Sequence, residues 1–287
     1  MQAADRRDGY ILIAPITAFL LVMLAIPLIV DVVYSVSKVT FETIRAPSFI
    51  GLGNFLTVLR DDDFWHAMLF SLRFAVFVTA AELAIGLFLA IYLAPLLSAR
   101  PWLIALLMLP MMVAPALVGL MYRLILHEFV GVIPYYFYLF TNDSPSFLGP
   151  QNAFSTLVVV ETLQWTPFAL LILYSAYQSI PLDVREAAAI DGAGRWGTLI
   201  FVELPWMLPT ILVVVFIRFI DSFRVFDNVY TLTGAGAGGN TTTMSIYIYE
   251  AFFKQDDIGV AVAASIILLL LSFVILAGIL RLSRRRA

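Results

Sequence analysis

The sequence predicts an all-α polytopic membrane protein with six transmembrane helices and one further helix in the loop between the fourth and fifth spans. Hydrophobic residues make up 62% of the 287 and charged residues only 13%, and the mean hydropathy is +0.95. An average soluble domain is roughly 45–50% apolar and about 25% charged. Too little polar surface is available to cover a water-soluble fold, so lipid is the expected solvent for most of the chain.

Six stretches are long and apolar enough to cross a membrane, for which about 20 residues are needed. The expected spans are 10–34, 68–94, 102–126, 153–178, 207–229 and 258–280. The first apolar run is longer than the h-region of a signal peptide, and no convincing small-residue cleavage site follows it. We therefore expect it to remain as the first transmembrane helix, with residues 1–9 and the basic tail 281–287 on one side of the membrane.

The distribution of basic residues predicts the orientation. Nine of the 17 Lys and Arg residues fall on the side of the two termini, four on the other side and four inside spans. The positive-inside rule then makes both termini cytoplasmic. The sequence has no cysteine, which excludes disulfides, thiolate metal sites and a cysteine nucleophile, and we expect no metal site.

The internal loop 179–206 is expected to hold a short helix. Asp183 and Glu186 have capping-box spacing ahead of a run of alanines, and Gly192 and Gly194 can end the helix. The plain interpretation is a linker between spans four and five, in which Glu186 serves only as a capping residue.

The same loop resembles the EAA loop of permease subunits in binding-protein-dependent ABC importers. The matching residues are Glu186-Ala187-Ala188, Gly192, Val202 and Leu204-Pro205, with Val202 where isoleucine is commonest. Flanking segments are similar to the carbohydrate-uptake, maltose/glycerol-phosphate permease-like branch of that family: 50–55, 161–168, 221–227 and 231–234. The resemblance identifies residues 68–280 as a permease core and the loop helix as a cytoplasmic coupling helix.

The resemblance implies a set of partners in a bacterial or archaeal cytoplasmic membrane. Two permease subunits, here expected to be different chains, would form the pore, two cytoplasmic ATPases would drive it, and a periplasmic or lipid-anchored binding protein would deliver the solute. Glu186 would anchor the EAA helix in a cleft of the ATPase, Ala187 and Ala188 would allow close approach, and Gly192 would permit the following turn. The Leu204-Pro205 pair completes the motif.

The sequence itself supports a separate ATPase subunit. A P-loop requires Gly-Lys followed by Ser or Thr, whereas the only lysines, Lys38 and Lys254, follow Ser37 and Phe253. We therefore expect no cofactor on this chain, ATP and Mg²⁺ on partner subunits, and no enzymatic activity of its own. Nucleic acid is not an expected partner; membrane lipid is.

Ionisable side chains inside the spans are functional candidates, because each costs several kcal/mol unless it is paired or faces water. Eight occur, four of each sign: Arg73, Glu82, Arg123, Glu161, Arg218, Asp221, Arg224 and Asp227. The last four alternate in sign at i, i+3, a spacing that allows successive salt bridges on one helix. Structural ion pairing is therefore the alternative to a substrate role, and Glu82 is interpreted as helix-packing contact.

Polar residues of spans four and five are expected at similar depths. Carboxylates, amides and guanidinium donors beside an aromatic ring suit a polyhydroxylated solute, because hydroxyls donate and accept and sugar C–H faces stack on rings. The predicted substrate-pathway residues are Glu161, Gln164, Trp165, Arg218, Asp221, Arg224 and Asp227.

The leading hypothesis is a pore-forming permease subunit that imports a sugar, oligosaccharide or polyol by alternating access. The alternative is an ion-coupled secondary transporter that uses the intramembrane carboxylates. Such a transporter would show an inverted repeat or paired broken helices, and neither is convincing here. An intramembrane enzyme lacks a credible constellation, since there is no Cys, no paired His and no Gly-x-Ser-x-Gly within a span.

Overall fold

The computed structural model describes the backbone of residues 2–234 and 241–284 and the side chains of residues 13–234, 241–278 and 281. Apart from Arg281, the side chains of the predicted segments 1–9 and 281–287 lie outside these residues, as does the middle of the Gly/Thr-rich segment 231–243. The described part of the chain is mostly helical, with one pair of two-residue strands. The all-α prediction is confirmed.

The chain forms two compact units, residues 1–62 with 248–270 and residues 63–247 with 271–287. The first unit is built from α1 (Gln2–Ser35), the antiparallel strands β1 (Ser37–Lys38) and β2 (Ser48–Phe49), and α2 (Gly53–Arg60). Its polar centre is the buried Asn54, whose side-chain amide donates to the carbonyl oxygens of Ser35 at 2.9 Å and Ser37 at 2.8 Å. One buried amide therefore fixes where α1 ends and α2 begins.

The second unit holds the helices from α3 to α12, apart from the first residue of α3, and parts of α13 and α14, whose residues 248–270 belong to the first unit. In chain order the elements are α3 (Asp62–Tyr92), α4 (Ala94–Ala99), α5 (Trp102–Leu107), η1 (Leu109–Met112), α6 (Pro115–Ile125), α7 (Val132–Thr141), α8 (Ala153–Gln178), α9 (Leu182–Ile190), α10 (Arg195–Thr198), η2 (Leu199–Glu203), α11 (Leu204–Phe223), α12 (Asp227–Thr233), α13 (Met244–Phe253) and α14 (Ile258–Arg284).

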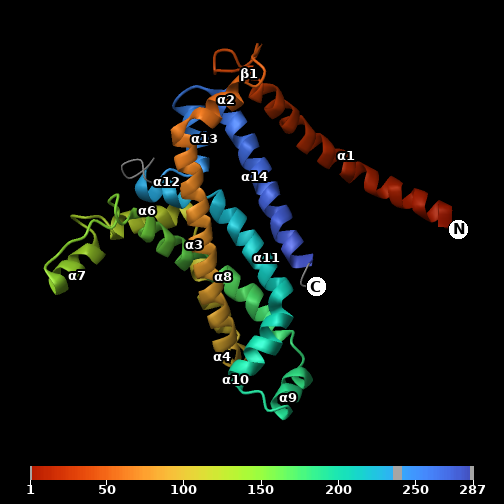
Figure 1. The fold of residues 1–287 in the computed structure, drawn as a ribbon, viewed down its shortest axis with the longest axis vertical. Coiled ribbons are helices and arrows are strands. Elements are labelled where there is room, and N and C mark those ends of the chain that lie inside the picture. Colours follow the sequence, from red (N-terminus) through yellow and green to blue (C-terminus); the bar gives the residue numbers. More distant parts are fainter. Residues whose placement is uncertain (1, 235–240, 285–287) are drawn as a thin grey trace. The chain divides into compact units, whose positions relative to one another are not determined.

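Helices α3, α8 and α11 form the frame of this unit, with α9 and α10 at one end of them and α6 and α12 towards the other (Figure 1). Apolar side chains of α3, α4, α8 and α11 pack in one cluster, and those of α3, α6, α8 and α12 in another. Gly86 lets α3 approach α8 closely, because a Cβ atom there would lie 2.9 Å from the Cβ of Ala169. The frame brings the polar residues of α3, α8 and α11 together.

Five helical segments of the described chain have the length and composition of membrane spans: Ile13–Ser35, Asp62–Tyr92, Ala153–Gln178, Arg195–Phe223 and Ile258–Gly278. The predicted third span, 102–126, is instead divided into α5, η1 and α6. Pro110 lies in the 3₁₀ turn and Pro115 starts α6; each lacks the N–H that a continuous helix needs. The count of six continuous spans is not confirmed.

The fifth span also differs from its predicted range, 207–229. The helical segment begins at Arg195, passes through the π-helical turn η2 and ends at Phe223, and α12 starts a new helix at Asp227. The segments 127–152 and 230–257, which the six expected spans leave as connections, contain the helices α7 and α13. Their apolar stretches are too short for a span, which is why the length criterion treated them as loops.

The helix expected in loop 179–206 is present as α9, but its predicted capping box is wrong. The N-cap is Pro181, which makes no side-chain cap hydrogen bond, and the helix starts at Leu182. Asp183 therefore already lies within the first turn, where a negative charge is favourable beside the helix N-terminus. Gly192 has φ +80°, a left-handed conformation that suits glycine and ends the helix as predicted.

Candidate functional site

A buried arginine is the centre of the polar cluster in the second unit. Arg218 of α11 is 1% exposed and Glu82 of α3 is fully buried. The Arg218 Nε donates to one Glu82 carboxylate oxygen at 2.6 Å, and Nη2 donates to the other at 2.8 Å. This two-pronged geometry is the strongest form of arginine–carboxylate pair, so α3 and α11 are joined across the apolar interior.

Arg218 also contacts α8 and the next turn of its own helix. Its guanidinium lies 3.6 Å from a carboxylate oxygen of Glu161 and 3.6 Å from one of Asp221. It covers the ring of Trp165, with the guanidinium carbon 4.7 Å from the ring centroid. One cation thus serves three carboxylates and an indole face, which offsets the cost of burying it.

A second arm of the cluster reaches α12 through Asn228. The buried Asn228 side-chain amide donates to Glu161 Oε2 at 2.6 Å and to Gln164 Oε1 at 2.8 Å. The amide of Gln164 in turn donates to the carbonyl oxygen of Val113 at 3.0 Å, in the break between η1 and α6. Hydrogen bonds and the ion pair between Arg218 and Glu161 therefore join α3, α8, α11 and α12 to one another and to the interrupted segment 102–126.

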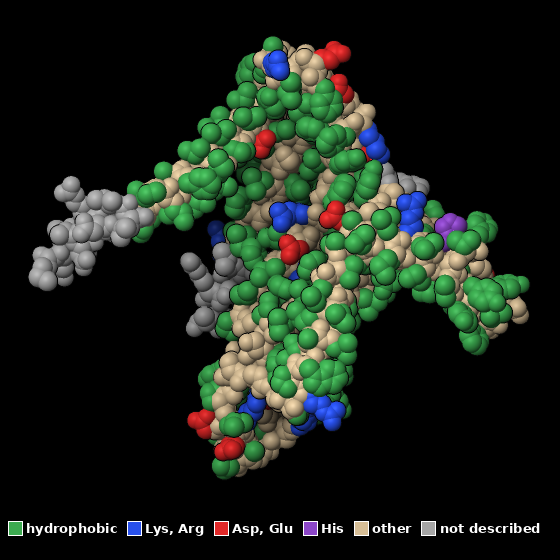
Figure 2. Space-filling view, turned by 180° about the vertical axis from the view of Figure 1, so that it is seen from behind, with side chains coloured by type: hydrophobic (Ala, Val, Ile, Leu, Met, Phe, Trp, Pro, Cys, Tyr) green, Lys and Arg blue, Asp and Glu red, His purple; other side chains and the backbone are tan. Residues whose placement is uncertain are grey.

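These side chains border a cavity of about 310 Å³. Six of the seven predicted pathway residues line it, namely Glu161, Trp165, Arg218, Asp221, Arg224 and Asp227. The seventh, Gln164, lines a separate and largely apolar cavity of about 530 Å³ beside α6. Figure 2 shows acidic and basic side chains together in the midst of a largely hydrophobic face.

The alternating charges of the fifth span form two of the three expected ion pairs. Asp221 lies 3.6 Å from Arg218 and 3.8 Å from Arg224. Among the described residues no ion pair joins Arg224 to Asp227, because α11 ends at Phe223 and the i, i+3 geometry of a single helix does not continue. Arg224 and Asp221 are about half exposed, so their charges face the cavity rather than the packed interior.

Two residues of the cluster were not among the predicted pathway residues. Glu82 was interpreted as a packing contact, and its pairing with Arg218 supports that interpretation. Asn228 gave no signal in the sequence beyond its position next to Asp227, since an amide is not an ionisable group. Arg73 and Arg123 lie apart from the cluster: Arg73 faces the ring of Phe154, and Arg123 donates to the carbonyl oxygen of Thr231 at 3.4 Å.

The EAA residues lie at the other end of the frame. Glu186 and Ala187 are exposed, whereas Ala188 is buried and faces the unit. Gly192 is exposed in the turn after α9, and Leu204-Pro205 starts α11. The exposed edge of α9 thus presents the carboxylate of Glu186 beside the small side chain of Ala187.

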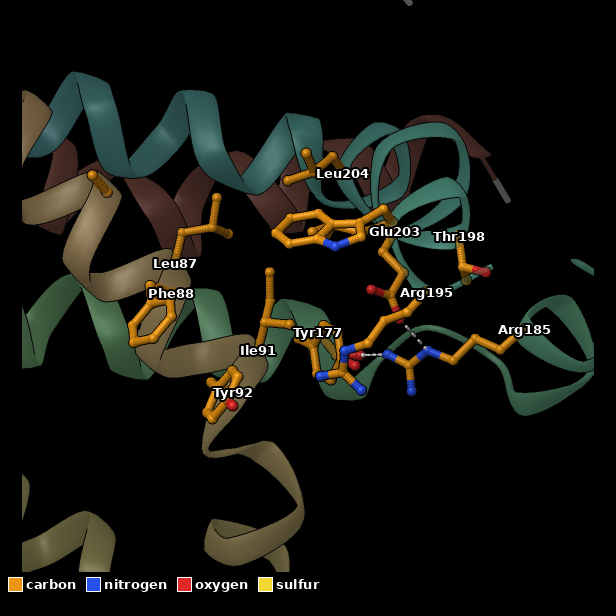
Figure 3. Close-up of a pocket in the computed structure, with 13 residues that line it drawn as sticks. Leu87, Phe88, Ile91, Tyr92, Tyr177, Arg185, Arg195, Thr198, Glu203 and Leu204 are labelled. Carbon is orange, nitrogen blue, oxygen red and sulfur yellow. Dashed lines mark hydrogen bonds and ion pairs between the residues drawn. The ribbon is translucent and has the colours of Figure 1, made fainter. Parts of the chain in front are cut away.

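Beside α9 lies a larger cavity of about 760 Å³ (Figure 3). Its apolar side comes from α3 and includes Leu87, Phe88 and Tyr92, and its polar side includes Arg185 of α9 and Glu203 of η2. In this view Arg185 reaches Tyr177 and Glu203. The Arg185 Nε lies 3.0 Å from a carboxylate oxygen of Glu203, as an ion pair rather than an aligned hydrogen bond.

The two regions differ in what they can do chemically. The central cavity presents carboxylate acceptors, guanidinium donors and an indole, which together can hydrogen-bond hydroxyl groups and stack on an apolar sugar face. Among the described residues, no group of three His, Asp or Glu is placed to hold a metal ion. The region around α9 presents an exposed carboxylate and small side chains at the end of the frame.

Comparison with known proteins identifies related chains. The family described as binding-protein-dependent transport system inner membrane component matches residues 82–287. The trehalose/maltose transport system permease protein MalF of Thermococcus litoralis is 32% identical, over 96% of this chain and 94% of that protein. The trehalose transport system permease protein SugA of Mycobacterium tuberculosis is 29% identical, over 93% of this chain and 85% of that protein.

A solved structure has the same fold. A chain of a bacterial alginate ABC transporter, in complex with an alginate pentasaccharide-bound periplasmic protein, superposes with a TM-score of 0.81 at 23% identity. The match covers 99% of this chain and 97% of that chain. The arrangement of α3, α8 and α11 is therefore that of a known ABC transporter chain.

Proposed function

The chain belongs to the family of binding-protein-dependent transport system inner membrane components, and we propose that it forms half of the pore of an ATP-driven importer for a sugar, oligosaccharide or polyol. As a member of this family it is a non-catalytic membrane subunit of a transporter. What we propose beyond membership is the solute class, the residues that contact the solute, and the partners.

The cavity around Arg218 carries the proposal. It places carboxylates, guanidinium groups and an indole inside a chain that is otherwise apolar, and it is bounded by helices α8, α11 and α12. At about 310 Å³ it lies at the small end of the range for ligand pockets, about 300–1,000 Å³, as expected if a second permease completes the site. Relatives named for trehalose and maltose transport support a saccharide as the solute.

The proposed assembly contains a second, different permease chain, two cytoplasmic ABC ATPases that hold ATP and Mg²⁺, and a periplasmic or lipid-anchored binding protein. Both termini would be cytoplasmic, which puts α9 on the side of the ATPases. The exposed Glu186 and Ala187 support this docking role for α9. ATP binding would bring the ATPases together and, through α9, open the cavity outward to the binding protein; hydrolysis would return it inward.

The experiment is sugar uptake by the complete complex in proteoliposomes, at saturating sugar-loaded binding protein. Trp165→Leu removes the ring that borders the cavity, while Trp102→Leu removes an exposed ring of α5 outside it. Aromatic contacts of this kind contribute about 0.5–1.5 kcal/mol, so we expect maximal uptake to fall about two- to tenfold in Trp165→Leu and to stay unchanged in Trp102→Leu. Equal uptake by the wild-type and Trp165→Leu complexes would remove the cavity from the proposed pathway.

A further inference from the structure

Arg185 connects three segments that meet at the end of the helical frame. Its Nη2 donates to the carbonyl oxygen of Tyr177, in the last turn of α8, at 2.9 Å. Its guanidinium carbon lies 4.1 Å from the centroid of the Tyr177 ring, and its Nε lies 3.0 Å from Glu203 at the base of α11. Figure 3 shows the two polar contacts as dashed lines. Through one side chain, α9 is attached to both α8 and α11.

The contacts are more enclosed than those of a surface ion pair. The side chains of Arg185 and Glu203 are 22% and 9% exposed, and a planar guanidinium that stacks on a ring while pairing with a carboxylate has little freedom to reorient. Surface pairs are screened by solvent and contribute little to stability. A pair at this depth leaves a buried carboxylate without its cation when Arg185 is removed.

Glu203 lies directly before α11, at the end of that helix that a displacement of the loop 179–206 would move first. It ends the π-helical turn η2, in which the N–H of Leu204 bonds to the carbonyl oxygen of Leu199. Such turns occur frequently at functional sites. From Glu203 the helix continues without interruption to Arg218, fifteen residues further and about 22 Å along the axis at 1.5 Å per residue.

The contact of Arg185 with Tyr177 connects α9 to the cavity around Arg218 through α8. Tyr177 lies near the end of α8, and α8 also carries Glu161 and Trp165. Both helices that Arg185 contacts therefore supply residues to the cavity. Besides Arg185, α9 contacts η2 and α10 and turns its buried Ala188 towards the unit. Pro181 and the Gly192 turn join it to the frame along the chain, so among the described residues Arg185 is its polar side-chain link to α8 and to the start of α11.

We propose that Arg185 is a positioning residue that makes α9 move as one body with the ends of α8 and α11. This inference rests on the proposed function, in which an ATPase moves α9. With Arg185 in place, displacement of α9 is carried to the cavity by two helices at once. Without it, α9 can shift against the frame, so the ATPases hydrolyse ATP while the cavity responds less.

The test is the number of sugar molecules transported per ATP hydrolysed by the complete complex in proteoliposomes. The variants are Arg185→Glu, Glu203→Arg and the exchanged double variant that carries both. The control is Arg100→Glu, which reverses an exposed charge at the C-cap of α4, where no carboxylate of the described chain forms an ion pair with it. A milder variant, Arg185→Lys, keeps the charge but loses the planar fork, and it serves if charge reversal prevents assembly.

We expect each single reversal to lower the transport-to-hydrolysis ratio at least about fivefold, the lower limit of typical coupling between sites. The exchanged double variant should regain part of the ratio, because the opposite charges at 185 and 203 again face each other, while the contacts of Arg185 with Tyr177 stay lost. Arg100→Glu should retain the wild-type ratio. Arg185→Lys should give an intermediate ratio. A role confined to stability would lower the amount of complex but leave the ratio of the assembled complex unchanged.

Two results would overturn the inference: assembled single variants that keep the wild-type ratio, or an exchanged variant as uncoupled as the single ones. If only Arg185→Lys assembles and its ratio equals that of the wild type, the inference is likewise wrong. Failure of the proposed function is separate, since it would appear as a wild-type complex that does not transport sugar with ATP.

Discussion

The pair between Arg218 and Glu82 offers the sharpest prediction of stability. Arg218→Met replaces the guanidinium with an apolar side chain and removes both of its hydrogen bonds to Glu82, at 2.6 and 2.8 Å. The Glu82 carboxylate then stays fully buried, next to the buried Glu161, and loses the one cation that pairs with it among the described residues. We expect this single change to destabilise the frame of α3, α8 and α11 strongly.

The magnitude follows from the contacts. Hydrogen bonds to charged groups contribute about 1.5–3 kcal/mol each, so two of them give roughly 3–6 kcal/mol. Breaking a buried pair by removing one partner costs about 3–5 kcal/mol, in agreement. The double variant Glu82→Met/Arg218→Met removes the pair as a whole and should be less destabilised than Arg218→Met alone, because no unpaired charge remains at position 82.

The assay is equilibrium unfolding of the purified chain in mixed micelles, with Arg224→Met as the matched control. Arg224 is about half exposed and 3.8 Å from Asp221, so its removal should cost less than about 1 kcal/mol. If Arg218→Met were no more destabilised than Arg224→Met, or if the double variant lost as much stability as Glu82→Met and Arg218→Met do together as single variants, the assigned role of the pair would be refuted.

Three further predictions follow from other contacts. Asn228→Leu removes two buried amide hydrogen bonds, at 2.6 and 2.8 Å, and should destabilise the chain by about 1.5–3 kcal/mol in the same unfolding assay; a loss below 0.5 kcal/mol, on the order of a neutral surface change, would contradict it. Gly86→Ala should cost about 1–3 kcal/mol by overpacking α3 against α8, whereas Gly278→Ala, with nothing within 4 Å, should not; equal melting of the two variants would count against the packing. Glu186→Ala alters an exposed side chain, so stability should change by no more than about 0.5 kcal/mol while copurification with the ATPase is lost; an intact complex would exclude Glu186 as the anchor.

The sequence predicted most of the long helices because length and hydropathy are sufficient for them. The ranges 153–178 and 258–280 agree closely with α8 and α14. The stretch 102–126 was joined into one span because averaged hydropathy ignores the missing N–H groups of Pro110 and Pro115. The helices α7 and α13 were not predicted, because each has only ten residues and the length criterion selects segments long enough to span a membrane.

The site was predicted as a set of residues but not as a geometry. Depth along the spans correctly grouped six side chains that line one cavity, because position in a helix reports depth. The ion-pair partner of each charged side chain depends on how each helix is rotated about its axis and on where it ends. The spacing of residues in the sequence reports neither: the end of α11 at Phe223 separates Arg224 from Asp227. The contact of these residues with a solute stays a prediction, as does the docking role of the EAA residues.

The family prediction is confirmed by the match to residues 82–287 and by relatives aligned over nearly the whole chain. It depended on the pattern from Glu186 to Pro205, whose spacing is independent of the exact start of the helix. The resemblance therefore remained informative although the predicted capping box was wrong.

ATP-dependent uptake by the reconstituted complex tests the central claim most directly. Proteoliposomes would hold this chain with its second permease and ATPases, and would receive binding protein loaded with trehalose, maltose or a polyol. The account predicts sugar accumulation that requires ATP and binding protein and that ceases in Glu186→Ala. Uptake by this chain alone, driven by an ion gradient without ATP, would contradict it.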